Sequence, residues 1–214
     1  MSNKAKSESV GGLKPRQAKL KRAFDILLAL TGLISVGWLI PLLALLARLD
    51  TGQNGFYRQE RIGYLGRPFR IIKIRTMRAV DGVTTTVTQA SDPRITKVGR
   101  ILRQFKLDEL PQLISILFGE MSFVGPRPDV PGLADRLEGH DRLVLAVRPG
   151  ITGPATIKYR NEEALLAEQR DPDIFNRQVL FPEKVKINVL YVENWSFAGD
   201  IGYIWKTLTG SLEL

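Results

Sequence analysis

The sequence predicts an α+β protein that is mostly helical, with one N-terminal membrane-embedded helix, a small β-hairpin and a compact helical domain. Three observations predict this fold class. A charge-free apolar run occupies residues 26–47, two strand-like runs follow within residues 56–75, and helical periodicity dominates from about residue 95 onward. With 44% hydrophobic side chains the chain can build a core, so wholesale disorder is excluded.

Residues 1–18 are expected to form a basic, flexible arm. Glycine and serine are frequent there, no apolar period is present, and helical structure is expected no earlier than Pro15. The whole chain has 31 lysine and arginine residues against 22 acidic ones, giving a net charge of +9 that points toward polyanionic partners. The charge by itself does not choose among nucleic acid, anionic lipid and a phosphorylated substrate.

Residues 19–49 contain the predicted membrane helix. Its charge-free stretch would extend roughly 33 Å as a helix, which is enough to cross a hydrocarbon core. Pro41 should kink this helix, because proline lacks a backbone donor. Basic residues flank both ends, so the positive-inside rule favours neither orientation. A re-entrant helix satisfies both flanks, whereas a straight span with a tolerated proline, or less readily a buried core helix, accounts for the same residues.

Residues 50–214 form the predicted globular domain. Runs at residues 56–62 and 68–75, joined by a four-residue turn with a glycine at each end, predict a β-hairpin, and a loop follows from Met77 to Pro93. The next helix carries a cationic stripe on one side, made by Lys97, Arg100 and Arg103. A solvated helix face is the ordinary explanation of such a stripe.

Two adjacent carboxylates, Asp108 and Glu109, are expected where a further helix begins. Pro111 is best tolerated in a first helical turn, and the apolar residues after it end at Gly119, which is suited to a C-cap. The free N–H groups at a helix start favour ionised carboxylates and attract phosphate. An N-capping aspartate followed by a first-turn glutamate explains the pair without any chemistry, and is the simpler explanation.

Two proline-stiffened loops present cations. In Pro126-Arg127-Pro128 an arginine is held in an extended loop, and Arg148 opens a second such turn, although each loop alone is consistent with ordinary turn chemistry. Helices are expected in the tail at residues 161–170, 173–180, 182–194 and 199–209. The late aromatic residues suit either a membrane interface or core packing.

Composition restricts the available chemistry. The chain has no cysteine and a single histidine, His140, which excludes a disulfide framework, thiolate metal sites and a cysteine nucleophile, and argues against histidine-based triads. Any chemistry must therefore come mainly from carboxylates, hydroxyls and cations.

Several motifs occur together in the order found in one family. They are the basic arm and the apolar helix with its internal proline, Phe56–Gly63, Phe69–Met77, Leu107–Gln112, Met121–Pro128 and Arg148–Gly153. Over roughly residues 19–209 the sequence resembles bacterial sugar transferases of the monotopic phosphoglycosyl transferase family.

This resemblance implies an activity and a location. The family transfers a phosphosugar from a nucleotide diphosphate sugar, here expected to be a UDP-sugar, to polyprenol (undecaprenyl) phosphate, releasing UMP. The reaction starts a surface glycan such as an exopolysaccharide, an O-antigen or a glycoprotein glycan. The resemblance also implies a re-entrant helix broken at Pro41, interfacial amphipathic helices, and a catalytic domain on the cytoplasmic face of the bacterial inner membrane.

The same resemblance assigns roles to particular residues. Asp108 would be the nucleophile of a covalent intermediate and Glu109 a ligand of Mg²⁺. The remaining expected site residues bind the substrate: Lys73, Arg103 and Arg148 by the phosphates, and Pro126, Arg127 and Pro128 by the nucleotide. Aspartate suits this role because it is ionised at neutral pH and forms a reactive acyl phosphate, while the cations shield the diphosphate charge.

One position departs from the family pattern. The family often has serine before the helix-breaking proline, where its hydroxyl can bind the freed backbone, but Ile40 stands here and leaves the sharpness of the bend open.

The rival hypothesis is a non-enzymatic, membrane-tethered basic module that holds anionic lipid or nucleic acid. It explains the arm and the apolar helix but not a carboxylate pair beside arginines. For the enzyme, the expected partners are the two substrates and the lipid bilayer, with no nucleic acid. No motif selects the sugar or sets an oligomeric state.

Overall fold

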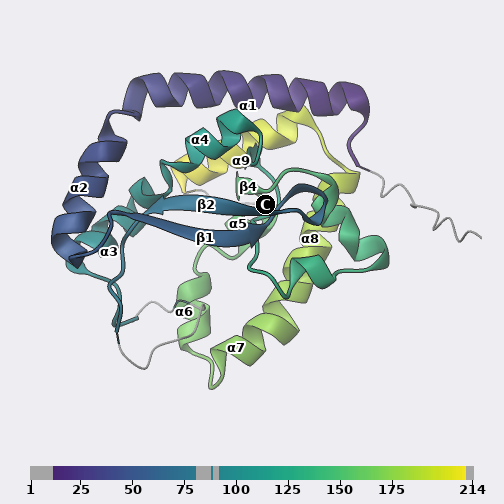
Figure 1. Cartoon of the computed structure of the whole chain (residues 1–214). Helices are drawn as coiled ribbons and strands as arrows, with labels where there is room; N and C mark the ends of the chain where they lie inside the picture. The colour runs from purple at the N-terminus through teal and green to yellow at the C-terminus, as the bar shows by residue number, and fades with distance from the viewer. Residues whose placement is uncertain (1–11, 81–87, 89–91, 211–214) are drawn as a thin grey trace, which may run out of the picture.

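A computed structural model describes residues 12–80, 88 and 92–210 of the chain. Within them the protein is mostly helical and contains a small antiparallel two-stranded sheet, which confirms the predicted fold class at that level (Figure 1). Most of the expected basic arm and much of the expected 77–93 loop lie outside the described residues, and the described end of the arm is already helical from Pro15.

The described elements are as follows. The α-helices are α1 (Pro15–Val36), α2 (Leu39–Thr51), α3 (Lys97–Gln104), α4 (Gln112–Phe118), α5 (Pro154–Lys158), α6 (Glu162–Ala167), α7 (Pro172–Phe175), α8 (Phe181–Glu193) and α9 (Phe197–Thr209). The strands are β1 (Phe56–Ile62), β2 (Pro68–Ile74), β3 (Ser122–Val124) and β4 (Gly150–Thr152). Short 3₁₀ turns are η1 (Tyr64–Gly66), η2 (Leu107–Glu109), η3 (Ala134–Arg136) and η4 (Gly139–Ala146), and the π-helical turn η5 (Asn176–Leu180) joins α7 to α8.

The apolar segment forms two helices instead of one. α1 and α2 are separated at Gly37 and Trp38 and are bent by 63° (Figure 1). In a continuous helix the ring of Pro41 would clash with the carbonyl of Gly37, four residues earlier. That carbonyl instead accepts a hydrogen bond of 3.1 Å from the Ile40 N–H. The break therefore lies before Pro41 and not at it, and Pro41 occupies the first turn of α2, where proline is tolerated.

Length and composition of the described helices bear on the membrane prediction. No single one of them is long and apolar enough to cross a bilayer, whereas α1 and α2 meet that criterion when taken together as a bent pair. Their outward faces are apolar, since Leu27 is 67% exposed, Ile34 82% and Leu49 75%.

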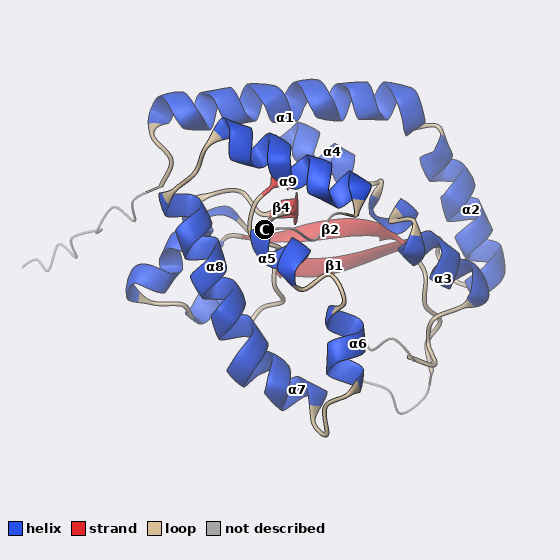
Figure 2. Cartoon of the chain, turned by 180° about the vertical axis from the view of Figure 1, so that it is seen from behind, coloured by secondary structure: helices blue, strands red, loops and turns tan. Residues whose placement is uncertain are grey.

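α1 is joined to the rest of the protein along its inner side. α4 and α9 both lie beneath it, on opposite sides (Figures 1 and 2). The Lys21 ammonium is buried 2.5 Å from a carboxylate oxygen of Asp200 on α9, and the Tyr191 hydroxyl donates to the other oxygen at 2.8 Å. Asp25, also buried, accepts a 3.0 Å hydrogen bond from Ser122 of β3. Buried charges need such partners, so α1 is fixed to the domain by specific contacts.

The β-hairpin is confirmed. β1 and β2 pair antiparallel with Phe56 opposite Ile74 and Tyr57 opposite Lys73, and the glycine-bounded turn contains η1. Ile71 packs with Ala29 of α1 in one buried cluster, whereas Ile74 packs in another with residues of α2 and α3. The hairpin thus fixes Lys73 between the apolar helices and the remainder of the domain.

A parallel pairing of β3 with β4 was not predicted. Ser122 lies opposite Gly150 and Val124 opposite Thr152. The Pro126–Pro128 loop therefore follows one strand of the pair, and Arg148 and Pro149 lead into the other. The backbones are very close here, because a Cβ atom on Gly150 would lie 2.2 Å from the Gly125 nitrogen. Only glycine fits such an approach, which explains the glycine in the second loop.

The predicted tail helices are present with changed boundaries. The expected helix at residues 173–180 is α7 followed by the π-helical turn η5, and it continues directly into α8. α5 was not predicted. The largest core cluster forms where α8 packs on η4, with Val185, Val189 and Trp195 among its members.

Candidate active site

The adjacent carboxylates lie in a tight turn between α3 and α4. α3 ends at Gln104, Lys106 adopts a left-handed conformation with φ of 56°, and η2 then carries both carboxylates before α4 begins at Gln112. Asp108 and Glu109 are only 6% and 7% exposed. Neither one caps α4, whose N-cap is Pro111 without a side-chain hydrogen bond. The simpler explanation offered by the sequence, a helix cap, is therefore wrong.

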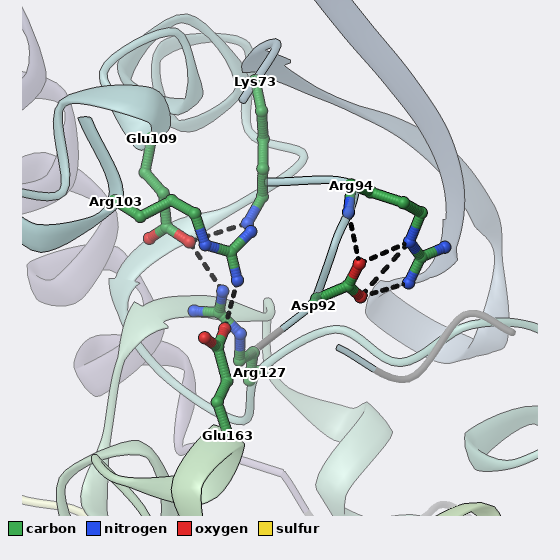
Figure 3. A network of polar contacts seen from close by, with 7 residues as sticks. All are labelled: Lys73, Asp92, Arg94, Arg103, Glu109, Arg127 and Glu163. Carbon is green, nitrogen blue, oxygen red and sulfur yellow. Dashed lines mark hydrogen bonds and ion pairs between the residues drawn. The ribbon is translucent and has the colours of Figure 1, made fainter. Parts of the chain in front are cut away.

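Glu109 is held by two cations from different elements. Lys73 Nζ of β2 and an Arg127 guanidinium nitrogen both donate to Glu109 Oε1, at 2.7 and 2.6 Å (Figure 3). Burial alone would raise the pKa of Glu109, but Arg127 and Lys73 outweigh burial and hold this pKa far below its usual range. Glu109 is therefore ionised, and Oε2 makes no hydrogen bond within the described residues.

Asp108 is in a different environment. No donor among the described residues reaches its buried Oδ1 atom. Burial and then the neighbouring Glu109 charge raise the pKa of Asp108, while Lys73 and Arg103 act in the opposite direction. Two adjacent carboxylates thus differ sharply, one neutralised by direct ion pairs and the other left without a partner among cations. A poorly solvated carboxylate of this kind is suited to act as a nucleophile.

Arg103 reaches the site from α3. Its guanidinium is paired with Glu163, a residue of α6, and the two side chains meet beside Arg127 (Figure 3). The adjacent Glu162 is paired with Lys184 of α8 at 2.6 Å. α6 therefore places two carboxylates against cations at the edge of the site.

Arg148 is the expected phosphate ligand that the structure does not bring to the dyad. Its Nε donates at 2.7 Å to the carbonyl of Gly119, at the opposite end of α4 from the carboxylates, and its guanidinium lies over the Tyr64 ring. Arg22 of α1 donates to the carbonyls of Ile116 and Leu117 at 2.5 and 2.7 Å. Both arginines therefore cap the C-terminus of α4, where positive charge is favourable.

The Pro-Arg-Pro loop holds its arginine between two buried prolines. Pro126 and Pro128 are buried while the Arg127 side chain is 43% exposed, so the flanking prolines fix the arginine's origin. Behind the loop lies a small pocket bounded also by η4 and α8. Asp129 lines it, and burial raises the pKa of Asp129 to about 6 despite the nearby Lys184 and Arg61.

Sequence reasoning missed Glu163, Gln112 and Asp129. Glu163 is the second residue of α6, and its contact with Arg103 spans 60 residues, so no local pattern signals it. Gln112 ends the Leu107–Gln112 motif, but the sequence assigns no role to it. In the structure it is 1% exposed, and its Nε2 atom has no partner among the described residues.

The side chains of the site can be compared with the ligands that Mg²⁺ requires. Within the described residues no group of three histidine, cysteine, aspartate or glutamate side chains converges. Mg²⁺ needs fewer, since it is commonly bound by one or two carboxylates together with substrate phosphates and water. A buried Asp108 oxygen without a donor and a Glu109 with one oxygen unengaged fit a cation that completes its shell with substrate.

These features define the class of protein, and sequence comparison gives the family. A buried carboxylate pair among cations is typical of enzyme sites that act on anionic substrates. Residues 16–213 match the family model described as bacterial sugar transferase. The chain belongs to this family and is a transferase, so the rival hypothesis of a non-enzymatic module is set aside.

Individual relatives agree with this assignment. An exopolysaccharide production protein ExoY of Sinorhizobium fredii is 34% identical, over 94% of this chain and 89% of that protein. A UDP-glucose:undecaprenyl-phosphate glucose-1-phosphate transferase of Caulobacter vibrioides is 34% identical, over 94% of this chain and 74% of that protein. The Escherichia coli protein with the same name is 37% identical over 88% of this chain, which matches 39% of its length.

Proposed function

We propose that this protein transfers a sugar 1-phosphate from a UDP-sugar to undecaprenyl phosphate, releases UMP, and so starts the synthesis of an exopolysaccharide or related surface glycan. Family membership and the names of the relatives support the reaction class. The observation that carries the proposed chemistry is the buried, unpartnered Oδ1 atom of Asp108 beside a Glu109 that two cations already neutralise.

In the first step a carboxylate oxygen of Asp108 attacks the phosphorus that bears the sugar. A P–O bond to Asp108 forms, and the bond from that phosphorus to the bridging oxygen of the diphosphate breaks. UMP leaves with the bonding electrons. No base is needed, because the nucleophile is an ionised carboxylate.

In the second step an oxygen of undecaprenyl phosphate attacks the same phosphorus. The acyl phosphate bond breaks, and the Asp108 carboxylate is regenerated. The product is a diphosphate that links the lipid to the sugar. Because the acceptor is a membrane lipid, the enzyme must hold Asp108 at a bilayer surface.

The cationic side chains shield the reacting diphosphate. Lys73 and Arg127 lie in contact with Glu109, and Arg103 is placed to exchange Glu163 for a substrate phosphate. Mg²⁺, held by Glu109 with substrate oxygens, would supply further charge neutralisation for the leaving group. We assign no direct phosphate contact to Arg148, since it caps α4.

The bent pair α1–α2 supports attachment to the membrane. We infer that it enters one leaflet and returns, with the catalytic domain on the cytoplasmic face of the bacterial inner membrane. The apolar outward faces of both helices and the 63° bend support this arrangement.

The test uses the full-length protein in detergent with Mg²⁺ and a panel of UDP-hexoses and UDP-acetamido sugars. Without lipid acceptor, one sugar should release UMP in a burst of up to one equivalent, and intact-mass measurement should show a sugar phosphate on Asp108. Asp108→Asn should lower turnover by at least about 1,000-fold and abolish the adduct, because its amide is not a nucleophile. Glu109→Gln should be severely impaired.

Asp141→Asn is the matched control, because Asp141 is exposed on η4 and outside the site. It should retain wild-type turnover. Accumulation of lipid-linked product while residue 108 stays unmodified would contradict the covalent route.

A further inference from the structure

Two buried polar atoms that lack a hydrogen-bond partner among the described residues lie on one helical segment. One belongs to Asp108, the proposed nucleophile, and the other belongs to Gln112. Within the described residues, four buried side-chain atoms have no hydrogen-bond partner, and Asp108 Oδ1 and Gln112 Nε2 are two of them. One is an acceptor and the other a donor. Leaving such a group buried without a partner costs about 1–3 kcal/mol, so each such atom requires an explanation.

The backbone places the two residues close together on one helical segment. Asp108 belongs to η2, Leu110 and Pro111 both have right-handed helical angles, and Gln112 is the first residue of α4. The chain is therefore helical without interruption from residue 107 into α4, and begins with 3₁₀-type hydrogen bonds such as that from the Leu110 N–H to the Leu107 carbonyl. Asp108 and Gln112 are thus about one helical turn apart. Ser115, about one turn further on, is also buried.

Packing does not explain the glutamine. Its neighbours on α4, Leu113 and Ile116, are buried apolar residues, and the side chain is 1% exposed. A methionine has a similar length and shape and would fill this space without a desolvation cost. A donor that the fold keeps buried and unsatisfied, about one helical turn from an unsatisfied carboxylate, indicates that both groups meet a ligand.

We propose that Gln112 is a further catalytic residue, whose carboxamide N–H donates a hydrogen bond to a phosphoryl oxygen when the phosphorus is bonded to Asp108. This inference rests on the proposed function. In this proposal a non-bridging oxygen of the phosphorus attached to Asp108 accepts the hydrogen bond from the buried Gln112 amide, about one helical turn away. The hydrogen bond forms as the Asp108–phosphorus bond forms, and therefore stabilises the transition state and the acyl phosphate more than the bound substrate.

The experiment compares Gln112→Met and Gln112→Glu with the wild type and with Ser115→Ala, in full-length protein with Mg²⁺ and the UDP-sugar that the panel identifies. The rate of the UMP burst without lipid acceptor, the yield of the Asp108 adduct and the unfolding temperature are measured. Gln112→Met should slow the burst by about 100-fold, as expected for losing one oxyanion donor, with KM for UDP-sugar little changed. Its unfolding temperature should be equal or higher, because an unsatisfied amide is removed.

Gln112→Glu should be slowed at least as much, since it places a negative charge beside the phosphoryl group, whereas Ser115→Ala should react at the wild-type rate. A burst within threefold of wild type in a folded Gln112→Met protein would overturn the assignment. Equal slowing in Ser115→Ala, or slowing that parallels lost stability, would also overturn it. Failure of the wild type to release UMP and form the adduct would instead refute the proposed function, so the two failures are distinguishable.

Discussion

At the scale of residues, two neighbouring carboxylates acquire different roles from their surroundings. Glu109 receives Lys73 and Arg127 on one oxygen, while no donor from the described part of the chain reaches the buried oxygen of Asp108. The charge of Glu109 is thus neutralised by residues that are far apart in sequence. Asp108 keeps a carboxylate that burial destabilises, and this property suits the nucleophile that we propose.

Asp129 offers a test of electrostatics that is separate from catalysis. Burial raises its pKa to about 6 from an ordinary value of 3.8, so the folded state binds a proton more tightly than the unfolded state. Its contribution to stability is therefore lost as pH rises from about 4 to about 6. Asp129→Asn should raise the free energy of unfolding above pH 7, by up to about 3 kcal/mol at about 1.4 kcal/mol per pKa unit.

Urea unfolding at pH 4.5 and pH 8 would measure this effect. The increase in the free energy of unfolding caused by Asp129→Asn should be large at pH 8 and small at pH 4.5, while Asp141→Asn should cause no such increase. An increase that becomes larger as pH falls would contradict the predicted direction of the pH dependence.

At the scale of elements, α4 connects the turn that carries the carboxylates to α1 and to the β3–β4 pair. Its N-terminal side follows the carboxylates, and its C-terminal carbonyls accept from Arg22 and Arg148. The arginines come from α1 and from the loop before β4, so α4 is fixed by both α1 and the parallel strand pair. The position of Asp108 therefore depends on contacts made at the far end of α4.

Arg148→Leu distinguishes this structural role from phosphate binding. It should lower the free energy of unfolding by about 1–2 kcal/mol, because it removes a charge-assisted hydrogen bond at a helix C-terminus. Turnover per folded molecule should stay within about threefold of wild type, in contrast to Lys73→Met, which should be severely impaired. Measuring UMP release and thermal unfolding on the same samples gives both values. A stable Arg148→Leu protein with a 100-fold loss of turnover would restore the phosphate role.

At the scale of the whole molecule, the bent helix pair and the catalytic domain form one connected structure. The buried Lys21–Asp200 pair ties α1 to α9, and Asp25 ties α1 to β3. Outward-facing apolar residues lie on the other side of α1 and α2. In the proposed membrane-bound state, this arrangement sets the domain directly against the bilayer surface.

A re-entrant helix pair predicts that both chain ends lie on the cytoplasmic side. The chain has no cysteine, so Ser2→Cys and Glu213→Cys each introduce a single labelling site. Neither should react with a membrane-impermeant maleimide in intact cells, and both should react after lysis. Labelling of Ser2→Cys in intact cells, with Glu213→Cys protected, would establish a straight span.

The sequence by itself determined the elements and the family. Periodicity and glycine-bounded turns identified the hairpin and the main helices, because those signals are local. The ordered motifs around Asp108 and Arg127 identified a sugar transferase. The same motifs could not show that Arg127 contacts Glu109 whereas Arg148 caps α4, because each motif contains an arginine next to a proline in a turn.

The tertiary structure decided which of these residues meet. The Arg103–Glu163 pair joins residues 60 apart, the β3–β4 pairing brings the two loops together, and burial leaves Asp108 and Gln112 without partners. It also placed the helix break at Gly37 and Trp38, because a proline disturbs the carbonyl four residues before it. Local residue patterns determine secondary structure, whereas desolvation and charge pairing depend on distances in space that only the folded chain sets.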